Sequence, residues 1–260
     1  MLTGSAGWAA SETCQTIVFR NDSGTAFTNI DALLPGACPG SAAWGDYDTD
    51  GDLDIVMAGD TIPSGYNSKV SQVYRNEGGG AFTDIEASLK DVYIGSATWG
   101  DYDRDNDLDI SLTGLGSARI YRNGITTTNT VPAAPSGLGA SPCSALSCNV
   151  TWSASSDDHT PTSGLTYNIR VGTTPGGGDI MSPMAITSTA VLTNAGYRLI
   201  PQMGNAGQML GFEVRGLNPE TTYYWSVQAV DTTYLGSPFS TEASFTTGSL
   251  SRVYLPAVIK

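Results

Sequence analysis

The stretch WGDYDTDGDLDIVMAG at residues 44–59 places five aspartates on alternate positions and then becomes apolar. The chain repeats this pattern 55 residues later as WGDYDRDNDLDISLTG, residues 99–114, with eleven of the sixteen positions identical. Ten of the 25 acidic residues lie in these two stretches. Two carboxylates about 4 Å apart repel each other by roughly 1 kcal/mol even in water. This local excess of negative charge at a fixed period predicts a bound cation rather than a solvated acidic loop.

The segments around the aspartates repeat as well. TIVFRNDSGTAFTNIDALL at 16–34 aligns without a gap on SQVYRNEGGGAFTDIEASL at 71–89. Each unit contains four short apolar segments separated by turn residues, and units of about 40 to 55 residues with this pattern are typical of propeller blades. We therefore expect an all-β fold with four-stranded blades over residues 1–128.

The repeats are incomplete at both ends of this region. LTG at 2–4 matches LTG at 112–114, and RIYRNG at 119–124 begins the repeated segment again. The region therefore holds one whole unit and two partial ones. A closed ring takes about four to eight blades, so the sequence predicts a partial β-propeller, with further blades and a signal peptide expected upstream.

The spacing of the aspartates is that of a calcium loop. Calcium takes about six to eight oxygen ligands, and loops of the EF-hand type supply them from alternate positions. Gly51 and Asn106, at the sixth position of their loops, tolerate the left-handed backbone that such a curl requires. Asp52 is expected to contribute its main-chain oxygen. The predicted ligands of two Ca²⁺ sites are Asp46, Asp48, Asp50, Asp52 and Asp54 in the first loop, and Asp101, Asp103, Asp105, Asp107 and Asp109 in the second.

The surroundings of these loops differ from those of an EF-hand. Met57 and Leu112 stand where the EF-hand loop closes with glutamate, and no helix is expected before either loop. Magnesium is disfavoured because it requires strict octahedral geometry and retains its waters. The sequence thus predicts a nine-residue calcium loop on a β scaffold.

Residues 1–128 resemble the FG-GAP or VCBS-type repeats of bacterial surface proteins, which are related to the calcium-bearing blades of the integrin α-subunit propeller. The resemblance rests on the aspartate loops and their 55-residue period, although Trp-Gly replaces Phe-Gly and no Gly-Ala-Pro follows. It implies a propeller fold and a structural metal at the positions given above. We expect Trp44 and Trp99 to fill the space between adjacent sheets, with stacking against a sugar as the alternative.

A second region follows the Thr-, Pro- and Ala-rich joint TTTNTVPAAPSGLGA. Its short segments alternate apolar and polar residues, which predicts a β-sandwich over residues 129–248. GLNPETTYYWSVQAVD resembles the fibronectin type III signature, with Leu217, Pro219 and Tyr223 in the tyrosine-corner region and Trp152 as the buried tryptophan of an early strand.

Two parts of this second region lie outside the resemblance. An insertion at about 172–210 is interpreted as a decorated loop or as an extra hairpin that forms a contact surface. The C-terminal tail, residues 249–260, is apolar and β-prone. It is interpreted as an edge strand or an export-related tag.

The four cysteines fall into two pairs that are close in sequence. Cys143 and Cys148 bracket SALS, a spacing that can close a short hairpin, and Cys14 and Cys38 have no counterparts in the next repeat. Two local disulfides in an oxidising compartment are the preferred interpretation, and four buried free thiols in a cytosolic protein are the alternative. Zinc is disfavoured because the chain has no Cys-x-x-Cys pair and a single histidine.

Composition argues against several classes of function. The net charge of −13 argues against nucleic acid as a partner, because phosphate binding requires basic patches. No window of about eighteen apolar residues exists, so no membrane span is expected. The single histidine, His159, has no nucleophile motif beside it, and no catalytic constellation is found.

The leading interpretation is therefore a secreted or cell-surface module for binding or adhesion. It is non-catalytic, its blades are stabilised by calcium, and its partner is an extracellular protein or a glycan. One alternative is an accessory region, carbohydrate-binding or spacer, of a larger secreted carbohydrate-active enzyme. The other is a purely structural stalk.

Overall fold

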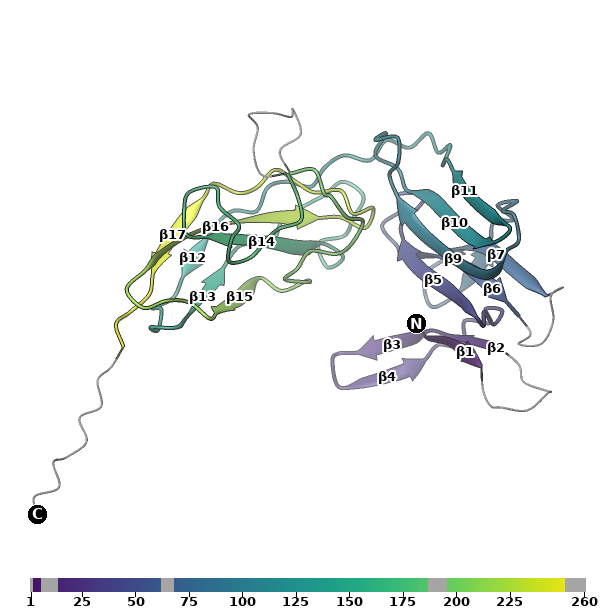
Figure 1. Cartoon of the computed structure of the whole chain (residues 1–260), viewed down its shortest axis with the longest axis horizontal. Coiled ribbons are helices and arrows are strands. Elements are labelled where there is room, and N and C mark those ends of the chain that lie inside the picture. Colours follow the sequence, from purple (N-terminus) through teal and green to yellow (C-terminus); the bar gives the residue numbers. More distant parts are fainter. Residues whose placement is uncertain (1, 6–13, 62–67, 187–195, 251–260) are drawn as a thin grey trace, which may run out of the picture. The chain divides into compact units, whose positions relative to one another are not determined.

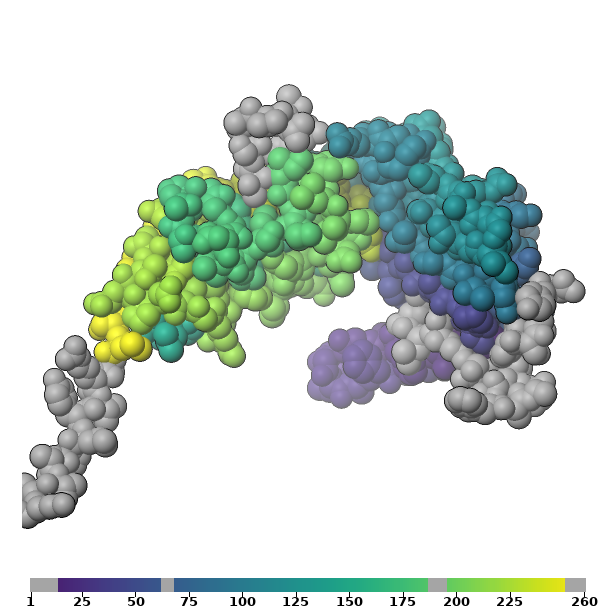
Figure 2. All heavy atoms as spheres, viewed as in Figure 1, coloured from purple at the N-terminus to yellow at the C-terminus, as the bar shows by residue number. Residues whose placement is uncertain are grey.

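The computed structural model describes residues 2–5, 14–61, 68–186 and 196–250, and the remaining residues are drawn in grey in Figure 1 and Figure 2. Within these ranges every regular element is a β-strand, as the sequence predicts. No helix of the described part is long and apolar enough to cross a membrane. The chain forms two compact units. The first comprises Met1–Thr130, Asp158–Gly164 and Thr232–Tyr234, and the second comprises the other residues.

The complete repeat of the first unit folds into one four-stranded antiparallel sheet. Its strands follow chain order: β5 (Gly40–Gly45), β6 (Asp54–Asp60), β7 (Lys69–Asn76) and β8 (Phe82–Asp84). All seven residues of β6 are buried, because this central strand is covered on both faces. The first aspartate loop joins β5 to β6, so both of its ends are fixed by the sheet.

The partial repeats form smaller sheets. One sheet has the order β11-β10-β9, built from β9 (Tyr93–Gly100), β10 (Asp109–Leu115) and β11 (Ser117–Tyr121). The second aspartate loop joins β9 to β10, as the first joins β5 to β6. Two hairpins come from the N-terminal part: β1 (Leu2–Ser5) with β2 (Cys14–Ile17), and β3 (Phe19–Asp22) with β4 (Ala26–Asn29). The described strands do not close into a ring.

Trp99 fills the space between two of these sheets. Its side chain is 3% exposed and packs in one cluster with Val56, Ala58 and Val73 of the neighbouring sheet. The indole Nε1–H donates to the carbonyl oxygen of Ala43 at 3.2 Å, and the ring stacks on Tyr47. This environment confirms the filling role predicted for Trp99 and leaves no open ring face for a sugar.

Both predicted disulfides are present. Cys14 bonds to Cys38, with their Cα atoms 5.6 Å apart, and Cys143 bonds to Cys148, with their Cα atoms 4.3 Å apart. The first disulfide joins β2 to the segment that enters β5, and the second closes the turn before β13 (Ser147–Thr151). The alternative of four free thiols is therefore wrong.

The second unit contains two three-stranded sheets around one core. The first has the order β12 (Gly139–Ala140), β13, β15 (Gly211–Arg215), and the second β14 (Thr166–Gly172), β16 (Thr222–Val230), β17 (Ala243–Thr246). Trp152 and Trp225 meet in this core with ring centroids 6.4 Å apart. Apolar side chains from both sheets belong to the same buried cluster, which is the arrangement of a β-sandwich.

The insertion of the second unit forms a short paired segment. The amide of Leu199 donates to the carbonyl oxygen of Met184, and the amide of Ile186 donates to that of Tyr197, both at 2.9 Å. Residues 187–195 between these two arms lie outside the described residues, as does most of the tail, residues 251–260. The interpretation of the tail as an edge strand or export tag therefore stays a prediction.

We predict that Tyr223→Phe destabilises the second unit by about 1 to 3 kcal/mol. Tyr223 is fully buried, and its hydroxyl accepts a 2.8 Å hydrogen bond from the amide of Asn218. The variant removes the acceptor of this amide, and the loss carries the cost of a broken hydrogen bond at a partly buried site. Differential scanning calorimetry measures the effect, with Tyr224→Phe, one residue further along β16, as the matched control. Equal losses in the two variants would contradict the prediction.

Candidate metal centres

Both aspartate loops curl in the same way. The backbone has positive φ at Thr49 (61°) and Gly51 (93°) in the first loop, and at Arg104 (64°) and Asn106 (73°) in the second. Each pair lies 55 residues from its counterpart. The left-handed conformation expected at the sixth position of each loop is thus confirmed.

The first aspartate of each loop organises the backbone of the turn. Asp46 accepts hydrogen bonds from the amides of Asp50 at 3.1 Å and Gly51 at 3.0 Å, and the hydroxyl of Thr232, in the same unit, donates to its Oδ2 at 2.6 Å. In the second loop the carboxylate of Asp101 accepts from the amides of Arg104, Asp105 and Asn106 at 2.6 to 3.3 Å. These bonds satisfy amides that the tight curl removes from strand pairing.

The last aspartate of each loop fastens the loop to the sheet. Asp54 accepts from the amides of Tyr47 at 3.0 Å and Asn76 at 2.8 Å, one on each carboxylate oxygen. Asp109 repeats this arrangement with the amides of Tyr102 at 2.9 Å and Asn123 at 2.8 Å. Both aspartates are buried, with at most 1% exposed. Each carboxylate therefore holds the start of its loop against the end of a neighbouring strand.

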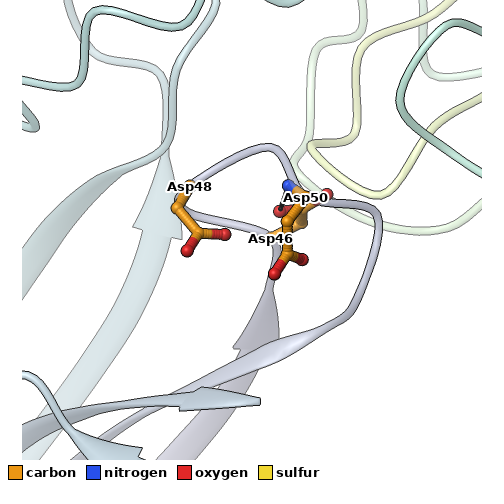
Figure 3. A group of neighbouring side chains, drawn as sticks. All are labelled: Asp46, Asp48 and Asp50. Carbon is orange, nitrogen blue, oxygen red and sulfur yellow. Dashed lines mark hydrogen bonds between the residues drawn. The ribbon is translucent and has the colours of Figure 1, made fainter. Parts of the chain in front are cut away.

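Each loop brings three carboxylates together. One oxygen atom from each of Asp46, Asp48 and Asp50 lies within 4.8 Å of the others, and the same holds for Asp101, Asp103 and Asp109. Figure 3 shows Asp48 facing Asp46 and Asp50 from the opposite side of the first loop. Oxygens bound to one calcium ion at about 2.4 Å can lie at most about 4.8 Å apart. The spacing within each cluster therefore fits a calcium ion.

A buried oxygen atom without a hydrogen-bond donor also supports a cation site at the first loop. Asp48 Oδ1 is buried and has no hydrogen-bond donor among the described residues. A buried oxygen of this kind is costly unless a donor or a metal satisfies it. Each cluster offers six carboxylate oxygens, and the loop carbonyls offer further oxygen atoms. Oxygens of these two types are the ligands that calcium prefers.

The clusters contain six of the ten predicted ligands. Asp54, Asp52, Asp105 and Asp107 lie outside these groups of three. Asp54 and Asp109 are counterparts in the repeat, yet only Asp109 belongs to a cluster. Asp52 is exposed, which agrees with a role through its main-chain oxygen, whereas the side chain of Asp107 is buried. The two sites are therefore similar but not identical.

Burial raises the pKa of the loop carboxyl groups. It raises the pKa of Asp46 to about 6 and that of Asp54 to about 7, from an ordinary value of 3.8. In the second loop, burial raises the pKa of Asp101 and Asp109 in the same direction. At neutral pH the folded unit thus holds carboxyl groups that are costly to ionise. A divalent cation would offset that cost.

Two residue types that take part in these sites were not singled out as such by the sequence. The side-chain amides of Asn76 and Asn123 donate to the carbonyl oxygens of Leu53 at 3.1 Å and Leu108 at 3.3 Å. The signal is the repeated Tyr-Arg-Asn at 74–76 and 121–123, which the sequence favours as a strand end and turn, with ligand contact as the alternative. Arg122 forms ion pairs with Asp103 and Asp105, both at 2.6 Å, which no repeat alignment predicts.

Comparison with known families finds a match over part of the first unit. Residues 46–112 match the profile of the FG-GAP-like repeat family. The matched FG-GAP-like segment contains both aspartate loops and the strands between them. No curated protein sequence matches the chain significantly.

Several solved structures are similar to part of the chain. The sixth fibronectin type III domain of human fibronectin type III domain containing protein 3 is 22% identical, with a TM-score of 0.34, over 50% of this chain and 98% of that one. An Fn3-like protein from Clostridium thermocellum is 24% identical, with a TM-score of 0.29, over 47% of this chain and 100% of that one. The FN5 domain of Drosophila Lar is 22% identical, with a TM-score of 0.27, over 46% of this chain and 99% of that one.

Proposed function

We propose that this chain is an extracellular, non-catalytic binding or adhesion module whose FG-GAP-like unit is stabilised by two calcium ions. The observation that carries the proposal is the pair of carboxylate clusters at corresponding loops. Asp46, Asp48 and Asp50 would hold one ion, and Asp101, Asp103 and Asp109 the other. Each ion would neutralise its loop and hold the junction between two strands in place.

The setting of the module supports an extracellular location. Two disulfides of the kind found here persist in oxidising compartments. FG-GAP-like repeats and fibronectin type III-like sandwiches both occur in extracellular proteins, and the chain combines a match to the first with similarity to the second. The partner we propose is an extracellular protein or a glycan.

Direct experiments distinguish the proposed binding module from two alternative roles. A role as an accessory region of a carbohydrate-active enzyme requires a catalytic domain in the same gene, which the full reading frame would show. A purely structural stalk would bind nothing on a glycan array or in a pull-down with extracellular proteins. Binding that needs the folded first unit would favour the adhesion module.

We predict that calcium raises the melting temperature of the first unit and leaves the second unchanged. Loops of extracellular modules bind calcium with dissociation constants of about 10⁻⁴ to 10⁻³ M, so 10 mM calcium, on the order of ten to a hundred times these constants, stabilises by about 1 to 3 kcal/mol per site. Calorimetry in 10 mM calcium and in excess chelator measures this difference.

Asp50→Ala is the companion variant. It removes one carboxylate of the first cluster while leaving the second intact, so the variant should lose about half of the stabilisation by calcium. Asp52→Ala, which changes an exposed side chain of the same loop, should retain it. Identical melting of the first unit with calcium and with chelator would contradict the metal sites.

A further inference from the structure

Each repeat carries an arginine and an asparagine at the end of a strand, but the residue after them differs. The three segments read Arg20-Asn21-Asp22, Arg75-Asn76-Glu77 and Arg122-Asn123-Gly124. Two repeats therefore offer an acid two residues after the arginine, and the third offers glycine.

Where the acid is present, the arginine pairs with it. Arg20 Nε lies 2.7 Å from Asp22 Oδ1, and the guanidinium of Arg75 lies 2.6 Å from Glu77 Oε1. A guanidinium bonded to a local carboxylate in this way is less available to other acids.

Where the acid is absent, the arginine turns to the aspartate loop. Arg122 Nε lies 2.6 Å from Asp103 Oδ2, and a terminal nitrogen lies 2.6 Å from Asp105 Oδ2. One guanidinium thus bridges two carboxylates of the second loop. Asp103 is one of the three residues of the second carboxylate cluster.

In the first loop, the aspartate that corresponds to Asp103 has no arginine partner within the described part of the chain. Asp48, the counterpart of Asp103, has a buried oxygen with no hydrogen-bond donor, whereas Asp103 holds Arg122. Among the described residues, the first loop therefore has no ion pair at the position where the second loop has one.

We propose that Arg122 is a built-in counter-ion of the second loop that a divalent cation must displace, so that the residue two positions after each arginine sets the calcium affinity of its loop. This proposal rests on the proposed calcium sites and specifies how they differ. The first loop binds calcium more tightly because Glu77 retains Arg75. The second binds it more weakly because Arg122 occupies Asp103 and adds a positive charge beside the ion.

The backbone permits an exchange of the two residues. A Cβ atom at Gly124 would meet no heavy atom within 4 Å, and the φ of Gly124 is not in the left-handed region. Gly124→Glu can therefore be accommodated and would offer Arg122 the partner that Arg75 already has. Glu77→Gly is the reciprocal variant, since it removes the partner of Arg75.

The experiment is a calcium titration of the full chain followed by NMR. The backbone amides of Gly51 and Asn106 report the filling of the first and second loops separately, and the Nε–H resonance of Arg122 reports its ion pair. We expect the wild-type second loop to bind about tenfold more weakly than the first, as is reasonable for one partly exposed charge beside the ion. Filling of this loop should shift the Arg122 resonance to that of a solvated arginine.

The variants should remove the difference in calcium affinity between the two sites. Gly124→Glu and Arg122→Gln should each tighten the second loop by about tenfold without changing the first. Glu77→Gly should weaken the first loop and leave the second as in wild type. Two results would overturn the proposal. One is a calcium affinity of the second loop that is the same in wild type and in Gly124→Glu. The other is an Arg122 resonance that does not move while the Asn106 amide responds to calcium.

Failure of the calcium sites themselves gives a different result. If neither Gly51 nor Asn106 responds to calcium in wild type, Gly124→Glu or Arg122→Gln, the proposed function fails and the competition by Arg122 fails with it. If both amides respond to calcium but the second loop does not bind it more weakly than the first, the calcium sites stand. The counter-ion proposal alone is then overturned.

Discussion

Replacing Asp54 with alanine lowers the free energy of unfolding of the first unit by about 2 to 6 kcal/mol in excess calcium. Asp54 is fully buried, and each of its carboxylate oxygens accepts one backbone amide, from Tyr47 and from Asn76. Alanine leaves both amides without acceptors, at about 1 to 3 kcal/mol for each. The loss is large because one side chain fixes both the loop and the end of β7. Chemical denaturation of the full chain, followed unit by unit, measures it.

The repeat supplies the control for this variant. Asp109→Ala should produce a loss of similar size, since Asp109 accepts from Tyr102 and Asn123 in the same geometry. Asp52→Ala, at an exposed position of the same loop, should cost little. In chelator the effect of Asp54→Ala should shrink, because the variant then also removes a buried negative charge. A loss below about 0.5 kcal/mol, the range of ordinary surface changes, would contradict the role of Asp54.

The stability of the calcium-free first unit falls as the pH rises from about 4 to about 7. Burial raises the pKa of Asp54 to about 7 and that of Asp46 to about 6, from 3.8. The folded state therefore holds protons that the unfolded state has already released, and stability decreases with pH across this window. For Asp54 alone the full change is on the order of 4 kcal/mol. Melting of the first unit in chelator, recorded between pH 4 and pH 8, tests the slope.

Calcium should reverse the sign of this dependence. The cation binds the ionised carboxylates, so the stabilisation by calcium grows as these groups lose their protons. In 10 mM calcium we expect the melting temperature of the first unit to hold steady or rise between pH 5 and pH 8. Asp54→Asn, which cannot ionise, should flatten the slope in chelator. A first unit whose stability in chelator rises with pH would contradict the assigned direction of the pKa changes.

Much of the architecture could be predicted from repetition and local chemistry. The 55-residue period located the strands on either side of each aspartate loop, because equal sequences at equal spacing fold alike. The left-handed turn at Gly51 and Asn106 followed from the few residue types that tolerate it. Trp99 was correctly placed between sheets because a large aromatic residue repeated at one blade position usually serves packing.

The differences between the two loops could not be predicted in the same way. The calcium ligands were assigned by equal spacing, which treats Asp54 and Asp109 alike, yet only Asp109 has an oxygen within 4.8 Å of its two cluster neighbours. The position of such an oxygen depends on side-chain rotamers and on neighbouring strands. The partner of Arg122 likewise depends on a missing acid at residue 124 rather than on any residue of the loop. Spacing specifies the ligand types, and tertiary contacts decide which ones converge.

The alternative partners of the repeated arginines have a consequence for how such modules evolve. A duplicated blade can keep every aspartate and still acquire a different ion threshold through one codon outside the motif, since glutamate and glycine codons can differ by a single base. Paralogous blades with identical acidic signatures would then respond at different calcium levels, giving a graded rather than an all-or-none stiffening of the array. A survey of these arrays should therefore record the residue after each Arg-Asn pair along with the aspartates.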